Sequence, residues 1–237
     1  MRLDKLLSNM GFGSRKDVKA LVKSKAVRVN DTIVKDSGAK VDPEKDVIMV
    51  GENVVEYKPY IYLMMHKPPG VISATDDRHD KTVIDLLEPE FQHYKPFPVG
   101  RLDKDTEGLL LITNDGQLAH QLLSPKKDVG KTYYAKIAGH VTEEDVQAFA
   151  SGVSLEDGYI TKPASLKILS AGSQSEIEVT ITEGKFHQVK RMFEAVGKKV
   201  VYLKRLSMGK LELEQTLKIG TYRELNEEEL SYCKSIK

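Results

Sequence analysis

The run from Gly100 to Leu110, GRLDKDTEGLL, combines a polar turn with the start of a buried strand. Glycines bound the turn, and the apolar residues 109–112 that follow predict a strand inside the core. Most carboxylates in a soluble protein lie on solvated faces. A carboxylate held in a turn beside Arg101 and next to a buried strand is instead a candidate for chemistry, which directs attention to Asp103.

From about residue 60 to residue 232, strand-like and helix-like stretches alternate. Strands outnumber helices, and several have the pattern of neighbouring antiparallel strands, so we predict an α+β fold with a mainly antiparallel mixed sheet. The strand candidates are residues 60–65, 109–113, 132–138, 176–182 and 200–204, and the helix candidates are residues 116–123, 142–151, 186–196 and 226–234. A polar segment near residues 51–59 is interpreted as a linker.

Residues 1–56 predict a small separate module. Apolar residues at positions 3, 6, 7 and 10 fall on one helix face. After a glycine-containing break, Ser14 and Asp17 have the spacing of a capping box that starts a second helix. Apolar stretches on both sides of Asn30-Asp31 predict a short hairpin.

The second helix of this module carries its charges on one face. Lys16, Lys19 and Lys23 lie opposite its apolar residues. A stripe of lysines on a packed helix suits a rigid platform against an RNA backbone. Together with Arg15, these lysines are candidate RNA contacts.

The net charge of +1 conceals two basic segments. Residues 1–40 contain ten Lys/Arg and four Asp/Glu, whereas the remainder contains 26 and 31. Within that acidic remainder, residues 184–210 contain eight Lys/Arg and one Glu. Two basic segments in a near-neutral chain predict two surfaces that meet phosphate groups.

Composition excludes several classes of protein. No apolar run approaches the ~18 residues of a membrane span, and the charged N-terminus lacks the apolar core of a signal peptide. The single cysteine, Cys233, precludes an internal disulfide and a thiolate zinc site, so a cytoplasmic protein is expected. The sequence contains neither metal-ligand spacing nor a glycine-rich nucleotide-binding motif.

Three sequence elements together resemble the motifs of the pseudouridine synthases. They are the Asp103 run, the segment KTY at residues 131–133, and the basic segment GKFHQVKRM at residues 184–192. The chain as a whole resembles the small-subunit-rRNA branch of this family. The resemblance implies an S4-like RNA-binding domain at residues 1–56 and a pseudouridine synthase catalytic domain at residues 57–237.

The resemblance places the nucleophile at Asp103. Pseudouridine formation detaches uracil from C1′ of its ribose and reattaches it through C5, and an Asp carboxylate can be the covalent nucleophile. Attack on C1′, addition to C6 of the ring and formation of a glycal all stay open as its first step. We interpret Asp105 as a turn residue that shapes the loop. Arg101 is expected to stack in the space that the flipped uridine leaves, or to hold a phosphate.

The other two motifs supply further candidates. Tyr133 corresponds to the family's active-site tyrosine, whose ring can stack on the base and whose hydroxyl can lie near C5. Lys190 corresponds to the cation that pairs with the catalytic carboxylate, and Arg191 is the alternative. We interpret His187 as an RNA-contacting or structural residue.

Two further matches concern Lys67 and Leu203. The segment HKPPG at residues 66–70 resembles the family's Lys-Pro-x-Gly element, in which proline and glycine fix a turn, and Lys67 is a candidate substrate contact. Leu203 corresponds to an apolar residue that closes the base pocket. A core leucine is the alternative for this position.

The resemblance therefore implies an enzyme that isomerises a specific uridine of 16S ribosomal RNA. It implies no cofactor, because the isomerisation is redox-neutral. The expected partner is 16S rRNA or a small-subunit assembly intermediate, and a monomer is expected because a single-site RNA enzyme needs no symmetry. The alternatives are a 23S rRNA synthase of the same family and a non-catalytic S4-type RNA-binding or ribosome-assembly factor.

Overall fold

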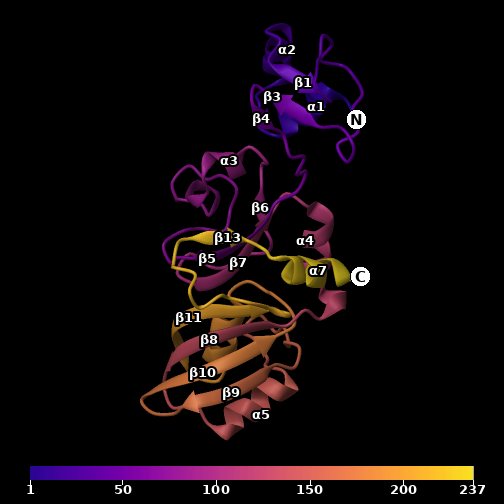
Figure 1. Ribbon diagram of the computed structural model, residues 1–237. Helices are drawn as coiled ribbons and strands as arrows, with labels where there is room; N and C mark the ends of the chain where they lie inside the picture. The colour runs from indigo at the N-terminus through magenta and orange to yellow at the C-terminus, as the bar shows by residue number, and fades with distance from the viewer. Residues whose placement is uncertain (237) are drawn as a thin grey trace. The chain divides into compact units, whose positions relative to one another are not determined.

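The computed structural model describes residues 1–236, which form two compact units (Figure 1). The first unit comprises Met1–Ile61 and Leu87–Pro96, and the second comprises Tyr62–Leu86 and the chain from Phe97 onward. Leu87–Pro96 thus belongs to the first unit although it follows part of the second unit in the sequence. A single boundary after residue 56 does not describe this division. In residues 1–236, no helix is both long enough and apolar enough to cross a membrane.

The first unit begins with the helices α1 (Leu3–Asn9) and α2 (Arg15–Lys23). The predicted capping box of α2 is confirmed. The Ser14 hydroxyl accepts from the backbone N–H of Asp17, and the Asp17 carboxylate accepts from the backbone N–H of Ser14. The apolar faces of both helices pack into one core: Leu3, Leu6, Leu7, Val18, Val22, Val27, Val41 and Ile48.

A four-stranded sheet in the order β2-β1-β3-β4 completes this core. Its strands are β1 (Val27–Val29), β2 (Thr32–Ile33), β3 (Ile48–Val50) and β4 (Asn53–Val54). The predicted hairpin is confirmed, with Asn30 and Asp31 at positive φ between its strands. The linker interpretation of residues 51–59 is wrong at its start, because β4 pairs with β3 through a turn at Gly51. A short helix, α3 (Pro89–Gln92), belongs to the segment that joins this unit late.

The second unit is built on a nine-stranded sheet in the order β13-β5-β7-β11-β8-β10-β9, with β12 on β11 and β6 on β7. Every pair is antiparallel except β7–β11, so the predicted α+β fold with a mainly antiparallel mixed sheet is confirmed. The strands are β5 (Tyr62–Lys67), β6 (Phe97–Pro98), β7 (Glu107–Thr113), β8 (Lys131–Ala138), β9 (Ser165–Ser170), β10 (Gln174–Ile181), β11 (Lys199–Met208), β12 (Leu211–Glu212) and β13 (Tyr222–Glu224).

The four predicted helices of this unit are confirmed to within two residues at each end. They are α4 (Gly116–Leu123), α5 (Glu143–Ser151), α6 (Gln188–Ala195) and α7 (Glu227–Ser235), and 3₁₀ turns occur at Ile84–Leu86 and Pro125–Lys127. Helix α6 begins two residues later than predicted, because His187 at the N-cap position has a left-handed φ of 49° and lies outside the helix. Four strands of this second unit were not predicted: β6, β12 and β13 are too short to show a period, and β9 is a largely exposed edge strand.

Gly108 lies in the one parallel pair of the sheet, opposite Arg205. Its φ is +115°, and a Cβ at this position would overlap the backbone of Arg205. Only glycine permits both the conformation and the close approach. Gly108 thus brings the 100–106 loop, which holds Asp103, next to β11.

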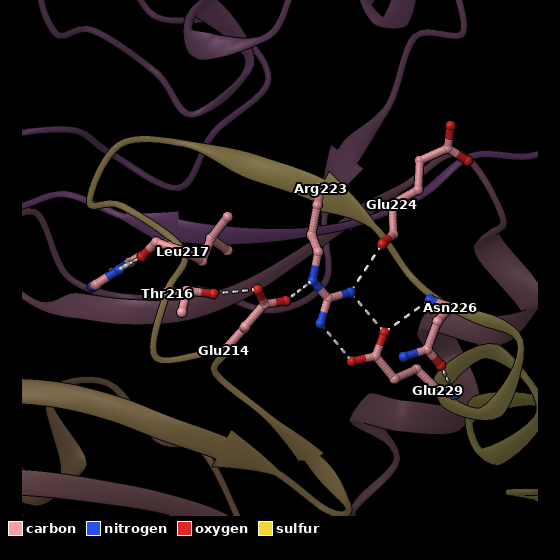
Figure 2. Close-up of polar contacts among 8 residues, drawn as sticks. Glu214, Thr216, Leu217, Arg223, Glu224, Asn226 and Glu229 are labelled. Atoms are coloured by element: carbon pink, nitrogen blue, oxygen red, sulfur yellow. Dashed lines mark hydrogen bonds and ion pairs between the residues drawn. The ribbon is translucent and has the colours of Figure 1, made fainter.

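Arg223 on β13 ties the last strand to the last helix (Figure 2). Its guanidinium donates to both carboxylate oxygens of Glu229 at 2.7 Å and pairs with Glu214. Asn226 and Glu229 form the capping box that starts α7. Hydrogen bonds from Arg223 lower the pKa of Glu229 despite its burial, and those from Thr216 and Arg223 lower the pKa of Glu214.

We expect Arg223→Met to lower the free energy of unfolding by about 2 kcal/mol at neutral pH, because it removes charge-assisted hydrogen bonds. Glu214 and Glu229 have folded-state pKa values below the ordinary 4.5. Their stabilisation is therefore fully present above that pH and is lost as the pH falls through the lowered values. Urea unfolding of both proteins from neutral pH to about pH 3 measures the difference, which should shrink with acid.

The control is Lys45→Met, which removes only an exposed pair with Asp42 and should change stability little. A difference between wild type and Arg223→Met that stays constant down to about pH 3 would contradict the assignment of this stability to the two glutamates.

Candidate active site

A cavity of about 570 Å³ in the second unit brings the three predicted motifs together. Asp103 and Arg101 line it from the 100–106 loop, Tyr133 from β8 and Lys190 from α6. Leu203 of β11 belongs to the same wall. A space of this size suits a nucleoside-sized ligand.

The register of the sheet explains how Tyr133 and Leu203 come to share a wall. In the antiparallel β8–β11 pair, Tyr133 lies opposite Arg205, and Leu203 lies opposite Ala135. Directly opposed residues, and residues two apart on one strand, point to the same face of a sheet. Tyr133, Leu203 and Arg205 therefore share one face, and all three are largely buried there.

Asp103 and Asp105 share the cation of Lys190. The ammonium lies 3.1 Å from Asp103 Oδ2 and donates to Asp105 Oδ1 at 2.7 Å. Burial opposes the charge of Lys190, but the two carboxylates outweigh burial and raise its pKa. The interpretation of Asp105 as only a turn residue is therefore incomplete, although its side chain is 73% exposed against 26% for Asp103.

His187 and Phe186 lie beside the same carboxylate. The Nε2 atom of His187 is 3.5 Å from Asp103 Oδ1, and its ring stacks on Phe186 with centroids 3.7 Å apart. Phe186 lines the cavity and is 68% exposed. Phe186 was not predicted as a site residue, although an exposed aromatic residue inside a basic segment is a signal for stacking on bases.

The prediction that Lys67 contacts the substrate is wrong, because its side chain is completely buried. Its ammonium donates to the backbone carbonyls of Pro68, Asp103 and Thr106 at 3.0, 3.1 and 2.9 Å. Burial lowers the pKa of Lys67 to about 8. This lysine holds the backbone of the 100–106 loop in place instead of reaching a ligand.

The alternative that Arg191 pairs with Asp103 is also wrong. The Nη2 atom of Arg191 lies 2.6 Å from Asp157 Oδ2, because one step along α6 turns its side chain away from Lys190. Arg101 is exposed, and its guanidinium has no ion pair with any residue of the described chain. Arg101 therefore remains available to a ligand at the cavity.

The four cations predicted to contact RNA in the first unit are all exposed on α2: Arg15, Lys16, Lys19 and Lys23. The opposite face of the helix is buried through Val18 and Val22. The exposure allows the predicted contact with RNA, which stays a prediction.

Two buried cations of the cavity wall, Lys131 and Arg205, were not predicted as site residues. Lys131 stands two residues before Tyr133 and so shares its face of β8. A charged residue on the buried face of a strand is the signal that would have identified it. The buried carboxylate of the wall, Glu183, accepts from Tyr159 and from Gln188, and these bonds lower its pKa despite burial.

Comparisons with known proteins agree with these motifs. Residues 61–195 match the family model described as RNA pseudouridylate synthase, and residues 1–48 match the S4 domain. The uncharacterized RNA pseudouridine synthase YtzG of Bacillus subtilis is 56% identical over 231 residues, which cover 97% of each chain. A crystal structure of a pseudouridylate synthase covers the whole of both chains, with a TM-score of 0.69 and 35% identity.

Two relatives bear on the kind of ribosomal RNA. The ribosomal small subunit pseudouridine synthase A of Vibrio cholerae is 40% identical over 98% of both chains. The ribosomal large subunit pseudouridine synthase B of Bacillus subtilis is 39% identical over 99% of this chain and 96% of that protein. The chain belongs to the RNA pseudouridine synthase family, whose members are isomerases, and it carries an S4 domain.

Proposed function

We propose that this protein isomerises a specific uridine of 16S ribosomal RNA to pseudouridine, with Asp103 as the nucleophile. The convergence of Asp103, Lys190 and Tyr133 on one cavity carries the proposal. Family membership supports the reaction, and the S4 domain with its exposed cations supports RNA as the substrate. We assign RNA anchoring to residues 1–56 and chemistry to residues 57–237. We also propose that the protein acts as a monomer in the cytoplasm, where ribosomal RNA is modified.

The base of the target uridine enters the cavity after it leaves its stack. Tyr133 offers its ring to one face of the base, and Leu203 limits the depth to which the base enters. Arg101, exposed at the cavity and without an ion pair in the described chain, occupies the vacated position in the RNA or holds a flanking phosphate. Phe186, exposed beside His187, suits stacking on a neighbouring base.

The ammonium of Lys190 lies 3.1 Å from the Asp103 carboxylate and pairs with the group that we assign as the nucleophile. Once C5 has bonded to the ribose, the C5 proton leaves and aromaticity returns. Tyr133 lines the cavity, and its hydroxyl is our candidate for assisting this proton transfer.

The assignment to 16S RNA rests on the segment HQVKRM at residues 187–192, whose sequence resembles that of the small-subunit branch. A 23S target is the second candidate, because the large-subunit relative is 39% identical against 40% for the small-subunit relative. The mechanism that we propose is the same for both RNAs.

Incubation of the protein with 16S and with 23S transcripts, followed by chemical mapping of pseudouridine at single-nucleotide resolution, tests the proposal. One new site in 16S RNA is the expected result. A site only in 23S RNA would keep the reaction and overturn the branch. If neither transcript nor small-subunit assembly intermediates gain a site, while RNA binding persists, the protein is a binding factor.

We also expect RNA affinity to fall steeply with salt, because the contacts of α2 are to phosphates. The triple variant K16Q/K19Q/K23Q should make the fall of log affinity with log salt less steep by about 2. The reason is that RNA binding without these phosphate contacts releases fewer counterions. Filter binding between about 50 and 200 mM salt measures the slope. Lys45→Gln, an exposed lysine outside α2, is the control and should leave it unchanged. An unaltered slope in the triple variant would exclude α2 from the RNA interface.

A further inference from the structure

Two cations in the wall of the cavity have no carboxylate partner in the described chain. Lys131 is 8% exposed, and its ammonium donates to the Val129 carbonyl at 2.8 Å. Arg205 is 2% exposed, and its Nε donates to the Leu109 carbonyl at 2.8 Å. The Nη2 atom of Arg205 is buried without a hydrogen-bond partner among residues 1–236.

This arrangement is costly unless a ligand completes it. A buried charge without a counter-ion, and a buried donor without an acceptor, both destabilise the folded state. Burial and the neighbouring charge of Arg205 lower the pKa of Lys131 to about 8, and no carboxylate opposes them. Glu183 does not compensate the pair, because its oxygens accept from Tyr159 and Gln188 at 2.6 and 2.7 Å. Lys131 and Arg205 in the cavity wall therefore suit a negatively charged ligand.

A second buried group without a hydrogen-bond partner lies in the same cavity. The hydroxyl of Thr106 is buried without a partner among residues 1–236, and Thr106 ends the loop that holds Asp103. Arg205 lies directly opposite Tyr133 on the neighbouring strand, and Lys131 precedes Tyr133 by two residues on the same face of β8. Lys131, Arg205 and Thr106 thus line the same cavity as Tyr133, on whose ring the base would stack.

These donors suit a base better than a phosphate. An RNA backbone stays at the mouth of a cavity, whereas an extruded base enters it. We propose that Lys131 and Arg205 are catalytic residues that bind the uracil ring and stabilise the anion it becomes when it detaches from the ribose. This inference rests on the proposed function and deepens it by assigning the charge-stabilising groups of the same site.

The Asp103 carboxylate forms a bond to C1′, the C1′–N1 bond breaks, and its electron pair stays on the uracil ring. The negative charge spreads over the ring and its two carbonyl oxygens, which are acceptors for the donors of Lys131 and Arg205. The ring then turns, C5 bonds to C1′ and the carboxylate leaves. The C5 proton is lost and N1 takes up a proton, so the product is an isomer of uridine.

Single-turnover conversion of a ribosomal RNA fragment by Lys131→Met and Arg205→Gln tests the proposal, together with RNA affinity and thermal unfolding. We expect the rate to fall about 100-fold, as for the loss of one oxyanion donor, with RNA affinity within about threefold. The melting temperature of Lys131→Met should change little, because removal of an uncompensated buried charge offsets loss of the hydrogen bond to the Val129 carbonyl. Lys136→Met, the same substitution on β8 outside the cavity wall, is the matched control and should keep the wild-type rate.

A merely structural role predicts a different pattern. Rates of both variants within about threefold of wild type overturn the proposal. A rate loss that accompanies a lower melting temperature of Lys131→Met, or that Lys136→Met shows equally, overturns it as well.

A binding measurement separates this inference from the proposed function. At neutral pH 5-nitrouracil is an anion, whereas uracil is neutral. We expect the wild-type protein to bind 5-nitrouracil at least about tenfold more tightly than uracil, and Lys131→Met to lose that preference. Conversion of RNA without the preference would leave the function and overturn the anion site. A preference that depends on Lys131 without conversion of any RNA would leave the anion site and overturn the function.

Discussion

Asp103→Asn is expected to lower the rate of uridine isomerisation by at least about 10⁴-fold, the scale on which removal of a nucleophile acts. Asparagine keeps the shape of the side chain, but its amide is neither charged nor nucleophilic. The backbone carbonyl of Asp103 accepts from Lys67 at 3.1 Å, and the substitution leaves this carbonyl in place, so the 100–106 loop should keep its conformation. Single-turnover mapping of the modified site, with RNA affinity and melting temperature alongside, measures the effect.

Asp105→Asn is the matched control, because the two carboxylates share the ammonium of Lys190. Asp105 is largely exposed, so its loss should change the rate by less than about tenfold while Lys190 pairs with Asp103 alone. A large loss in Asp105→Asn together with a small loss in Asp103→Asn would transfer the nucleophile to Asp105. Equal losses in both would show that the shared cation, and not a single carboxylate, governs the reaction.

The sequence predicted the elements of the fold that carry a long and regular pattern. Strand β8 alternates buried residues with more accessible ones over its whole length, and α2 combines a capping box with an apolar face. Strands of two or three residues show no period, and the hairpin of β3 and β4 was missed for that reason. The joining of Leu87–Pro96 to the first unit depends on contacts between distant parts of the chain, which no local pattern records.

The site was predictable in its motifs and less so in its contacts. The motifs identified Asp103, Tyr133 and Lys190, which the fold gathers around one cavity. The sequence did not show that Lys67 turns inward, because a lysine before two prolines reads as equally suited to solvent and to burial. Arg191 illustrates the same limit, since one residue along a helix decides which carboxylate a cation reaches.

Lys67→Met is expected to remove both stability and activity. The ammonium of Lys67 binds the carbonyls of Asp103 and Thr106 inside the protein, and methionine fills the volume without donating a hydrogen bond. Leaving these acceptors unsatisfied should lower the free energy of unfolding by about 3 kcal/mol. The released loop should also lower the isomerisation rate about 100-fold, because a displacement of the nucleophile on the order of 1 Å has that effect.

Lys104→Met separates the anchoring role of Lys67 from the general loss of a positive charge near RNA. Lys104 lies on the same loop, but its ammonium pairs with Asp80 at 2.6 Å at the surface, and such a pair contributes at most about 1 kcal/mol. Urea unfolding and single-turnover rates of the two variants make the comparison. If Lys104→Met matched the rate loss of Lys67→Met at wild-type stability, contact with RNA and not the carbonyls that Lys67 binds would account for the effect. The anchoring model requires that stability and rate fall together in Lys67→Met alone, because the same hydrogen bonds fold the loop and position Asp103.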